Sequence, residues 1–459
     1  MGTSVFLGVA SVAMCLASCG DGPENQTFTL FTVAPNCTDR DTKKFVSETM
    51  GDWYLYVDAL PAIDYTKFAG APDALLDELT LNARVANRDR FFSALTTVSE
   101  DNGFLVRGDF IGFGLTFARS LNGQGLFVVD VLEESPAARA GFMRGDRVLS
   151  IGKDSSDLVP VSAIIDSPKN LSAALGSNFP GVTRTFLVQT TLGSQQERIV
   201  SKSAFTYESV PHFRILENDG QAPIGYIQLR AFLESSGRSI KDALELFAQR
   251  DVRQIVVDLR YNGGGVLDVA QSFADLLSAG RVAGDVMFRT NYNEKHSANS
   301  RIAEFRPTSK SIAAERIAFI TTGLTASASE VLINSLSPYV EVSIIGSQTL
   351  GKPVGNVAID MPGCDVRLRL VAFSVVNGRG NGGYFDGLPD TSFSGAFCPT
   401  SEDLSKIPGN TDDPLMLEAV FWLNNRRCGG STLMSPINSN DSQRVISIDD
   451  ALGRVSASY

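Results

Sequence analysis

The chain has 459 residues, with 40 Lys and Arg against 51 Asp and Glu, which gives a formal net charge of −11. Hydrophobic residues make up 43% of the chain, enough for about three domains with sizeable cores. The acidic balance argues against binding to nucleic acid or to an anionic membrane surface, since both need a basic face. The two histidines, His212 and His296, lie far apart in the sequence. We therefore expect no metal site or cofactor, and a base other than imidazole for any nucleophilic catalysis.

An apolar run from Val5 to Ser18 is too short for an ordinary membrane-spanning helix and has the length of a signal-peptide core. It ends in Leu16-Ala-Ser-Cys19, which resembles the lipobox of bacterial lipoproteins, although no Lys or Arg precedes the run. The alternatives are a plain secretory signal and an uncleaved anchor. We expect residues 1–19 to be a lipoprotein signal peptide. Lipidation of Cys19 would then hold the protein on a bacterial membrane facing the periplasm, with residues 20–37 as a tether.

Removal of the leader and lipidation of Cys19 would leave four cysteines, an even number in an exported chain, where disulfides persist. Four cysteines allow three pairings. We expect Cys364–Cys398, which are close in sequence, and Cys37–Cys428, which would tie the two ends together.

Residues 38–204 fall into two parts with different patterns of apolar residues. Apolar residues recur at helical spacing over about 38–57 and again over 72–82, so residues 38–102 are predicted to be a small helical cap. Residues 103–204 instead show short β-type runs broken by Gly and Pro, at 111–117, 125–131 and 147–151. Within them Ser135 and Pro136 indicate a helix start and Gly141 its end.

From residue 223 onward β and α signals alternate, which predicts an α/β core with largely parallel strands. After Cys428 the chain is rich in Ser and Asn, so residues 429–459 are interpreted as a C-terminal extension. The expected strands are 224–229, 254–259, 317–321 and 342–345, and the expected helices are 239–250, 266–277 and 327–336.

Three segments of this core carry candidate chemistry. Ser327 stands between a strand and a helix among small residues, where the helix N-terminus offers free amides to a substrate, although a lone serine there is more often a helix cap. Lys352 follows one strand–helix–strand unit later, and a desolvated lysine serves as a general base. The run Gly263-Gly264-Gly265 follows a buried strand and matches no phosphate-loop spacing. It predicts an oxyanion hole from Gly263 or Gly264 with the amide of Ala328.

These segments, in this order and spacing, resemble the carboxy-terminal processing peptidases, or tail-specific proteases, which use a Ser–Lys dyad. The likeness extends to Gly225-Tyr-Ile-Gln-Leu229 and Gly387-Leu-Pro-Asp390 and covers roughly residues 40 to 428. It implies Ser327 as nucleophile, Lys352 as general base and an α/β spiral core of the caseinolytic-protease and crotonase type. Two positions depart from the family pattern: Pro338 stands where some members have Asp, and Asn356 where others have Gln. Asn356 is therefore only a tentative orienter of the lysine, and Glu330 is expected to stabilise the first turn of the helix.

Residues 103–204 are similar to the PDZ module that this family carries between cap and core. Gly112-Phe113-Gly114-Leu115 resembles its carboxylate-binding loop, whose amides hold a terminal carboxylate while the peptide adds as a strand. Two later segments, 135–141 and 145–149, match the rest of the PDZ signature.

The sequence thus predicts an α+β multidomain protein with a helical N-terminal cap at 38–102, a PDZ β-sandwich-like module at 103–204 and a Ser–Lys peptidase core at 205–428. The expected activity is that of a serine endopeptidase acting on exported polypeptides with unstructured free C-termini. One alternative is a peptide-binding scaffold without turnover, which Pro338 and Asn356 motivate. The other is an acyl-CoA enzyme on the same superfold. The oligomeric state is left open.

Overall fold

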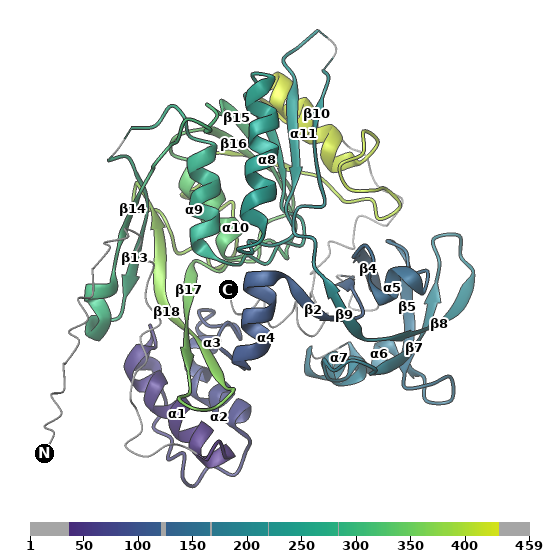
Figure 1. Ribbon diagram of the computed structural model, residues 1–459, viewed down its shortest axis with the longest axis vertical. Coiled ribbons are helices and arrows are strands. Elements are labelled where there is room, and N and C mark those ends of the chain that lie inside the picture. Colours follow the sequence, from purple (N-terminus) through teal and green to yellow (C-terminus); the bar gives the residue numbers. More distant parts are fainter. Residues whose placement is uncertain (1–35, 121–124, 166–167, 219, 283, 431–459) are drawn as a thin grey trace, which may run out of the picture.

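The computed structural model describes residues 36–120, 125–165, 168–218, 220–282 and 284–430 (Figure 1). The predicted leader with Cys19, the tether as far as residue 35 and the extension from residue 431 lie outside the described residues. Among the described helices, none has both the length and the apolar character needed to cross a membrane.

The core is built on a six-stranded sheet in the order β10-β11-β12-β15-β16-β19. β10 runs antiparallel to β11, and the remaining neighbours are parallel. The parallel strands need crossover connections, which helices provide. The strands are β10 (His212–Leu216), β11 (Ile224–Gln228), β12 (Gln254–Asp258), β15 (Arg316–Thr321), β16 (Glu341–Gly346) and β19 (Ala396–Pro399).

Helices cover both faces of this sheet, because successive residues of a strand point to opposite sides. Ile255 and Val257 pack with α8 (Ser236–Gln249), α9 (Leu267–Leu276) and α10 (Ala328–Leu336) on one face. Val256 between them packs on the other face with α11 (Pro414–Asn425). Figure 1 shows α8, α9 and α10 on one side and α11 on the other.

A second sheet joins the core to the N-terminal helices. It runs β1-β18-β13-β14, with β17 also paired to β18. The helices α1 and α2 share a hydrophobic cluster with β17 and β18, including Phe45, Leu76 and Leu370. The N-terminal segment is therefore packed into the core. The elements are α1 (Asp39–Trp53), η1 (Val57–Ala59), α2 (Pro72–Leu79), α3 (Leu81–Val85), β1 (Ala94–Thr96), α4 (Val98–Asn102), η2 (Gly103–Arg107), β13 (Val286–Tyr292), η3 (Glu294–Asn299), β14 (Ile302–Glu304), β17 (Val354–Asp360) and β18 (Arg367–Asn377).

In the sequence, a small β module with its own core around Phe186 lies between the N-terminal segment and the core, and in Figure 1 it projects to one side of both. Its sheet runs β3-β4-β5-β7-β8, with β6 paired to β5. A two-stranded ribbon of β2 and β9 connects the module to the rest, and the boundary predicted at residue 204 falls inside β9. The elements are β2 (Asp109–Gly112), β3 (Leu115–Arg119), β4 (Leu126–Val131), α5 (Pro136–Arg139), β5 (Arg147–Gly152), β6 (Val159–Pro160), α6 (Val161–Ile164), α7 (Pro168–Leu175), β7 (Thr183–Gln189), β8 (Gln195–Ser201) and β9 (Ser203–Thr206).

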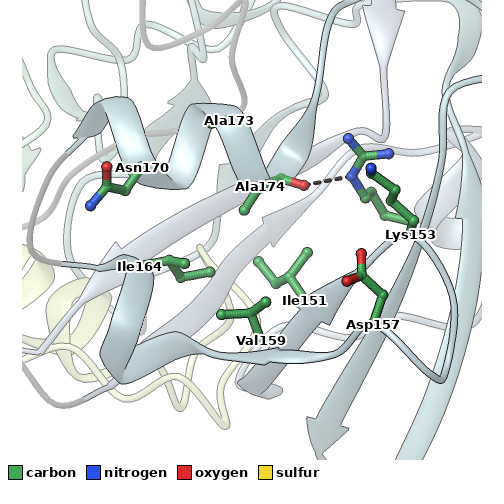
Figure 2. A pocket seen from close by; sticks show the side chains of 10 residues that line it. Ile151, Lys153, Asp157, Val159, Ile164, Asn170, Ala173 and Ala174 are labelled. Atoms are coloured by element: carbon green, nitrogen blue, oxygen red, sulfur yellow. Dashed lines mark hydrogen bonds between the residues drawn. The ribbon is translucent and has the colours of Figure 1, made fainter.

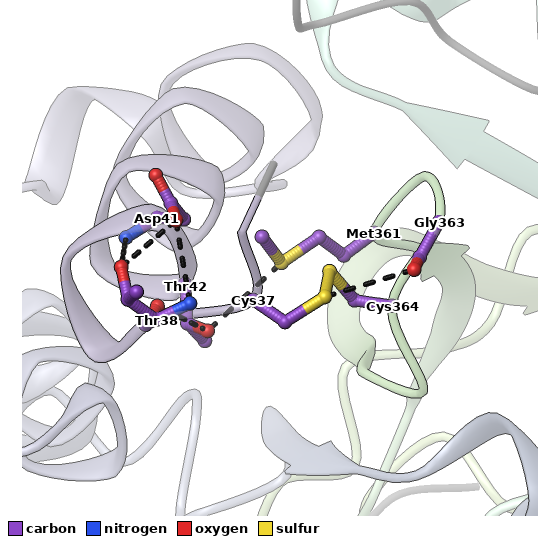
Figure 3. The surroundings of a disulfide bond; sticks show 7 residues. All are labelled: Cys37, Thr38, Asp41, Thr42, Met361, Gly363 and Cys364. Carbon is purple, nitrogen blue, oxygen red and sulfur yellow. Dashed lines mark hydrogen bonds between the residues drawn. A yellow bond between two sulfur atoms is a disulfide. The ribbon is translucent and has the colours of Figure 1, made fainter. Parts of the chain in front are cut away.

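The structure pairs the cysteines as Cys37–Cys364 and Cys398–Cys428, so both predicted disulfides are wrong. Cys37 directly precedes α1, and α1 packs against the β17–β18 hairpin whose turn carries Cys364 (Figure 3). Cys398 lies on the edge strand β19, and the chain returns to it after α11. Proximity in sequence was a poor guide, because residues 364 and 398 belong to different sheets.

Candidate active site

Ser327 lies at the start of α10, after the turn that follows β15. Its φ of 54° is in the left-handed region, which is strained for a residue with a Cβ. Strained backbone of this kind is concentrated at functional sites. The residue is 6% exposed, so a reagent reaches it only from one side. The strand-to-helix position predicted for the nucleophile is therefore the observed one.

The glycine run lies directly against Ser327. A Cβ on Gly264, whose φ is 113°, would meet Ser327 Cβ at 2.8 Å and Ala328 N at 3.0 Å, so only glycine fits there. The Gly264 amide donates to Asn262 Oδ1 at 2.9 Å. This internal hydrogen bond favours Gly263 over Gly264 as the predicted oxyanion donor. In the described residues, the amides of Gly263 and Ala328 donate no hydrogen bond to protein.

Asn262 organises this loop, a role that sequence reasoning missed. Its Nδ2 donates to Leu229 O at 2.8 Å, and its own carbonyl accepts from Ala326 N at 3.0 Å and from Ser329 Oγ at 3.1 Å. The end of β12 is thus tied to the segment that carries the serine. An Asn before a glycine run is the signal for such a bracing role, since its side chain bonds nearby backbone.

Glu330 joins the serine segment to the lysine segment. It is fully buried, and its Oε2 accepts from Ser327 N and from Lys352 N, both at 2.8 Å. Its Oε1 accepts from Gly351 N at 2.7 Å and from the Thr349 hydroxyl. Burial raises the pKa of the Glu330 carboxyl despite these four donors. Glu330 therefore does more than stabilise a helical turn, because its carboxylate holds the backbone at Ser327 and the backbone at Lys352 at a fixed distance from each other.

Lys352 is completely buried beside the N-terminal segment. Its Nζ lies 5.2 Å from the centroid of the Phe92 ring. Burial lowers the pKa of the Lys352 ammonium well below its ordinary value, and the Asp89 carboxylate is the largest influence opposing that shift. Arg369 lowers this pKa further, while Glu330 raises it. A lysine in this setting holds a neutral amine at a pH where an exposed lysine is charged.

Asn356 makes a different contact from the predicted one. Its Nδ2 donates to Phe92 O at 2.6 Å, and its buried Oδ1 has no hydrogen-bond partner in the described part of the chain. It therefore accepts no hydrogen bond from Lys352, because its side chain is turned toward the backbone of the N-terminal segment. At the other departing position, Pro338 O accepts from Arg379 Nη2 at 2.8 Å.

The Gly387-Leu-Pro-Asp390 segment supports the lysine loop. A Cβ on Gly387 would meet Thr349 O at 2.2 Å, and one on Gly351 would meet Phe385 O at 2.3 Å. The two backbones are thus in direct contact at these glycines. Leu388 N also donates to Thr349 Oγ1 at 2.7 Å.

Neither histidine lies in these segments. His212 is exposed at the start of β10. The ring of His296 stacks on Trp53, with centroids 3.6 Å apart, and its Nε2 is 3.2 Å from Asp52 Oδ2. One cluster of potential metal ligands joins Cys398, Glu418 and Cys428, but its two sulfurs are bonded to each other.

The predicted carboxylate loop, Gly112 to Leu115, connects β2 to β3. In the described residues β3 pairs with β4 alone, so no strand pairs with its other edge. Gly114 has a φ of 84°, and a Cβ there would meet Ser135 Cβ at 2.1 Å. The loop is thus pinned against the start of α5, with Phe113 O accepting from Ala137 N at 2.8 Å.

A separate, partly open hollow of about 350 Å³ lies on the module between α7, α6 and β5 (Figure 2). Lys153 and Asp157 stand at its edge, while Ile151 and Ile164 form apolar parts of its wall. Arg184, which also lines it, donates to Ala174 O at 2.5 Å. No residue of the 112–115 loop lines this hollow, so it is distinct from the predicted peptide site.

Comparisons with known proteins show what these segments are similar to. The model of peptidase family S41 matches residues 223–386, and that of the peptidase S41 N-terminal domain matches residues 41–94. A Staphylococcus epidermidis protein named "Probable CtpA-like serine protease" is 23% identical over 326 residues, or 70% of this chain and 60% of that protein. A Staphylococcus aureus protein of the same name is 29% identical over 251 residues, or 54% of this chain and 46% of that protein. The chain thus spans about half to three fifths of the length of these curated relatives.

Solved structures show the same fold. A Bacteroides fragilis protein assigned to the S41 proteases superposes with a TM-score of 0.61 at 22% identity, covering 83% of this chain and 97% of that chain. The photosystem II D1 C-terminal processing protease superposes with a TM-score of 0.50 at 16% identity, covering 79% and 94%. The predicted fold class, with its N-terminal helices and α/β peptidase core, is confirmed. Both peptidase S41 domain models thus match parts of this chain, the N-terminal domain model at residues 41–94 and the peptidase model at residues 223–386.

Proposed function

We propose that this protein is a serine endopeptidase in which Ser327 is the nucleophile and Lys352 the general base. The observation that carries the proposal is the bridge through Glu330, whose single Oε2 bonds the backbone amides of both residues. The family match and the relatives named as serine proteases support the reaction type. The lowered pKa of Lys352 supports its role as a base.

The chemistry follows from these positions. Ser327 Oγ attacks the scissile carbonyl carbon while its proton moves to the neutral Nζ of Lys352. The tetrahedral intermediate then expels the amine, which takes the proton from the lysine, and leaves an ester on Ser327. Water then attacks that ester while its proton moves to the neutral amine of Lys352, and the ester is hydrolysed. The amides of Gly263 and Ala328 are the proposed donors to the oxyanion.

We further propose that the β module is a PDZ domain that selects free, unstructured C-termini. The edge position of β3 in its sheet supports this, because a peptide can add to an unpaired strand edge as an extra strand. The loop from Gly112 to Leu115 lies at the start of that strand, where a terminal carboxylate would be held.

The predicted lipid anchor at Cys19 and the periplasm-facing location complete the proposal. The two disulfides of the structure support an exported chain, since such bonds persist in oxidising compartments. Polypeptides are the proposed partners.

The test is degradation of an unfolded substrate with a free apolar C-terminus by wild type, Ser327→Ala and Lys352→Ala. We expect turnover by wild type alone, and slower turnover when the substrate C-terminus is amidated. An inert wild type would support the scaffold alternative, which the lysine's missing contact to Asn356 favours. Failure of a sulfonyl fluoride to sulfonylate Ser327 would favour the acyl-CoA enzyme.

A further inference from the structure

The loop of residues 87–93, between α3 and β1, closes over the lysine segment. Arg90 Nη2 donates to Leu350 O at 2.8 Å and to Gly351 O at 2.5 Å, directly before Lys352. Further along the same loop, the Phe92 ring faces Lys352 Nζ at 5.2 Å. The N-terminal segment therefore forms one wall of the lysine's pocket.

Asp89 is the fixed negative charge of this loop. It is fully buried, and its Oδ1 accepts from Phe92 N at 2.8 Å and Ser93 N at 3.1 Å. Its Oδ2 accepts from Ser93 Oγ at 2.6 Å and Tyr54 OH at 2.9 Å. Ser93 Oγ in turn accepts from Val371 N at 3.1 Å, which ties the loop to β18. Four donors hold the carboxylate in a single orientation.

Three charged groups act on Lys352 from the elements around it: Asp89 in the loop, Glu330 on α10 and Arg369 on β18. Glu330 already bonds three backbone amides and a hydroxyl. Arg369 is paired with Asp101 through bonds of 2.8 and 2.6 Å. Of the two carboxylates, Asp89 raises the pKa of Lys352 more than Glu330 does, and it comes from outside the peptidase core.

We propose that Asp89 is a positioning residue for the Ser–Lys dyad, which together with the face of Phe92 stabilises the ammonium formed when Lys352 takes the proton of Ser327. A buried ammonium needs a nearby negative charge, and an aromatic face adds to that stabilisation. A third residue beside the dyad would otherwise take this role, and neither Asn356 nor Pro338 makes a contact that does so. The inference rests on the proposed function, and it makes the N-terminal segment part of the active site.

The test follows sulfonylation of Ser327 by phenylmethylsulfonyl fluoride, in which the serine oxygen bonds to sulfur and fluoride leaves. The rate is measured by mass spectrometry as a function of pH, so no natural substrate is needed. Wild type and Lys352→Ala come first. If wild type is not labelled, or if Lys352→Ala is labelled at the wild-type rate, the proposed function itself fails. If both behave as proposed, the remaining variants test Asp89 alone.

Asp89→Asn keeps acceptors for the loop amides and removes the charge. We expect the acid limb of its labelling profile to move to lower pH by about one unit, with the plateau rate about tenfold lower. Tyr54→Phe is the matched control, because it removes a hydrogen bond to the same carboxylate and keeps the charge, so its acid limb stays at the wild-type pH. An unshifted limb in Asp89→Asn, or an equal shift in Tyr54→Phe, overturns the proposal.

Circular dichroism shows whether Asp89→Asn folds. If it does not, Phe92→Leu carries the test, since it removes the aromatic face beside Nζ and keeps an apolar side chain. Its acid limb is expected to shift in the same direction by a smaller amount. A limb at the wild-type pH in folded Phe92→Leu then overturns the proposal.

Discussion

Replacing Glu330 by Gln perturbs the bridge between the serine and lysine segments with almost no change in shape. The carboxylate accepts four hydrogen bonds in a fully buried site, two at each oxygen. A Gln side chain has one acceptor oxygen and one donor NH2 group. Two of the four donors must then face an NH2 group.

The less costly orientation of that Gln can be worked out from the partners. With its oxygen toward Ser327 N and Lys352 N, its NH2 faces Gly351 N and the Thr349 hydroxyl. A hydroxyl can turn to accept, but a backbone N–H cannot, so the Gly351 amide is left without a partner. One buried donor left unpaired costs about 1–3 kcal/mol, and the loss of charge-assisted bonds adds to that. We expect a total loss of about 2–4 kcal/mol in the free energy of unfolding.

Urea unfolding measures this loss, and labelling of Ser327 by a sulfonyl fluoride measures its consequence for the site. The matched control is Glu341→Gln, since Glu341 is exposed at the start of β16 and pairs with Arg426 at 3.4 Å. An exposed pair contributes about 0–1 kcal/mol. If Glu330→Gln loses no more stability than this control and is labelled at the wild-type rate, then Glu330 does not set the geometry of the dyad.

Three further predictions follow from the same site and from the disulfides. Lys352→Met should melt at a higher temperature than wild type at neutral pH and should not be labelled. In wild type the pKa of Lys352 is lower in the native state than in the unfolded state, so the free energy of unfolding falls as the pH drops from the unfolded pKa toward the native pKa. Thermal melts over this pH range should show that this pH dependence is absent in Lys352→Met. Gly264→Ala should abolish labelling of Ser327 while circular dichroism still reports a folded chain, because its Cβ would meet Ser327 Cβ at 2.8 Å; labelling at the wild-type rate would contradict the close approach. In urea, Cys364→Ser should lose more stability than Cys428→Ser, about 6 against about 4 kcal/mol, because the closed loops span 327 and 30 residues; the reverse order would count against the loop-entropy argument.

The sequence predicted the parallel core closely because its strands are short apolar runs separated by amphipathic helices. β12 begins at Gln254 and α10 ends at Leu336, as predicted. The second sheet was not predicted, because β17 and β18 pair with segments far along the chain and their pattern gives no partner. The N-terminal helices were predicted, but their packing against Leu370 on β18 depends on that sheet.

The site was predictable to the extent that each residue sits in a local motif. Ser327, Lys352 and the glycine run are such residues, and the structure brings them together through Glu330 and Gly264. Asp89 has no local signal, because a lone Asp in a polar loop looks like any turn residue. Its position depends on a contact between the 87–93 loop and the lysine segment, more than 250 residues away.

That contact bears on why the N-terminal helices are fused to the core. In the proposed mechanism the buried lysine is neutral before proton transfer and charged after it, so it needs an environment that tolerates both forms. The core supplies the burial, and Glu330 is occupied by its four donors, so a second carboxylate has to come from elsewhere. Cys37–Cys364 and the hydrophobic cluster around Phe45 hold the N-terminal segment on β17 and β18, and with it the loop that carries Asp89. Loosening that attachment should therefore reduce acylation of Ser327 before it unfolds the core, since the lysine would lose its charge partner while the sheet stays intact.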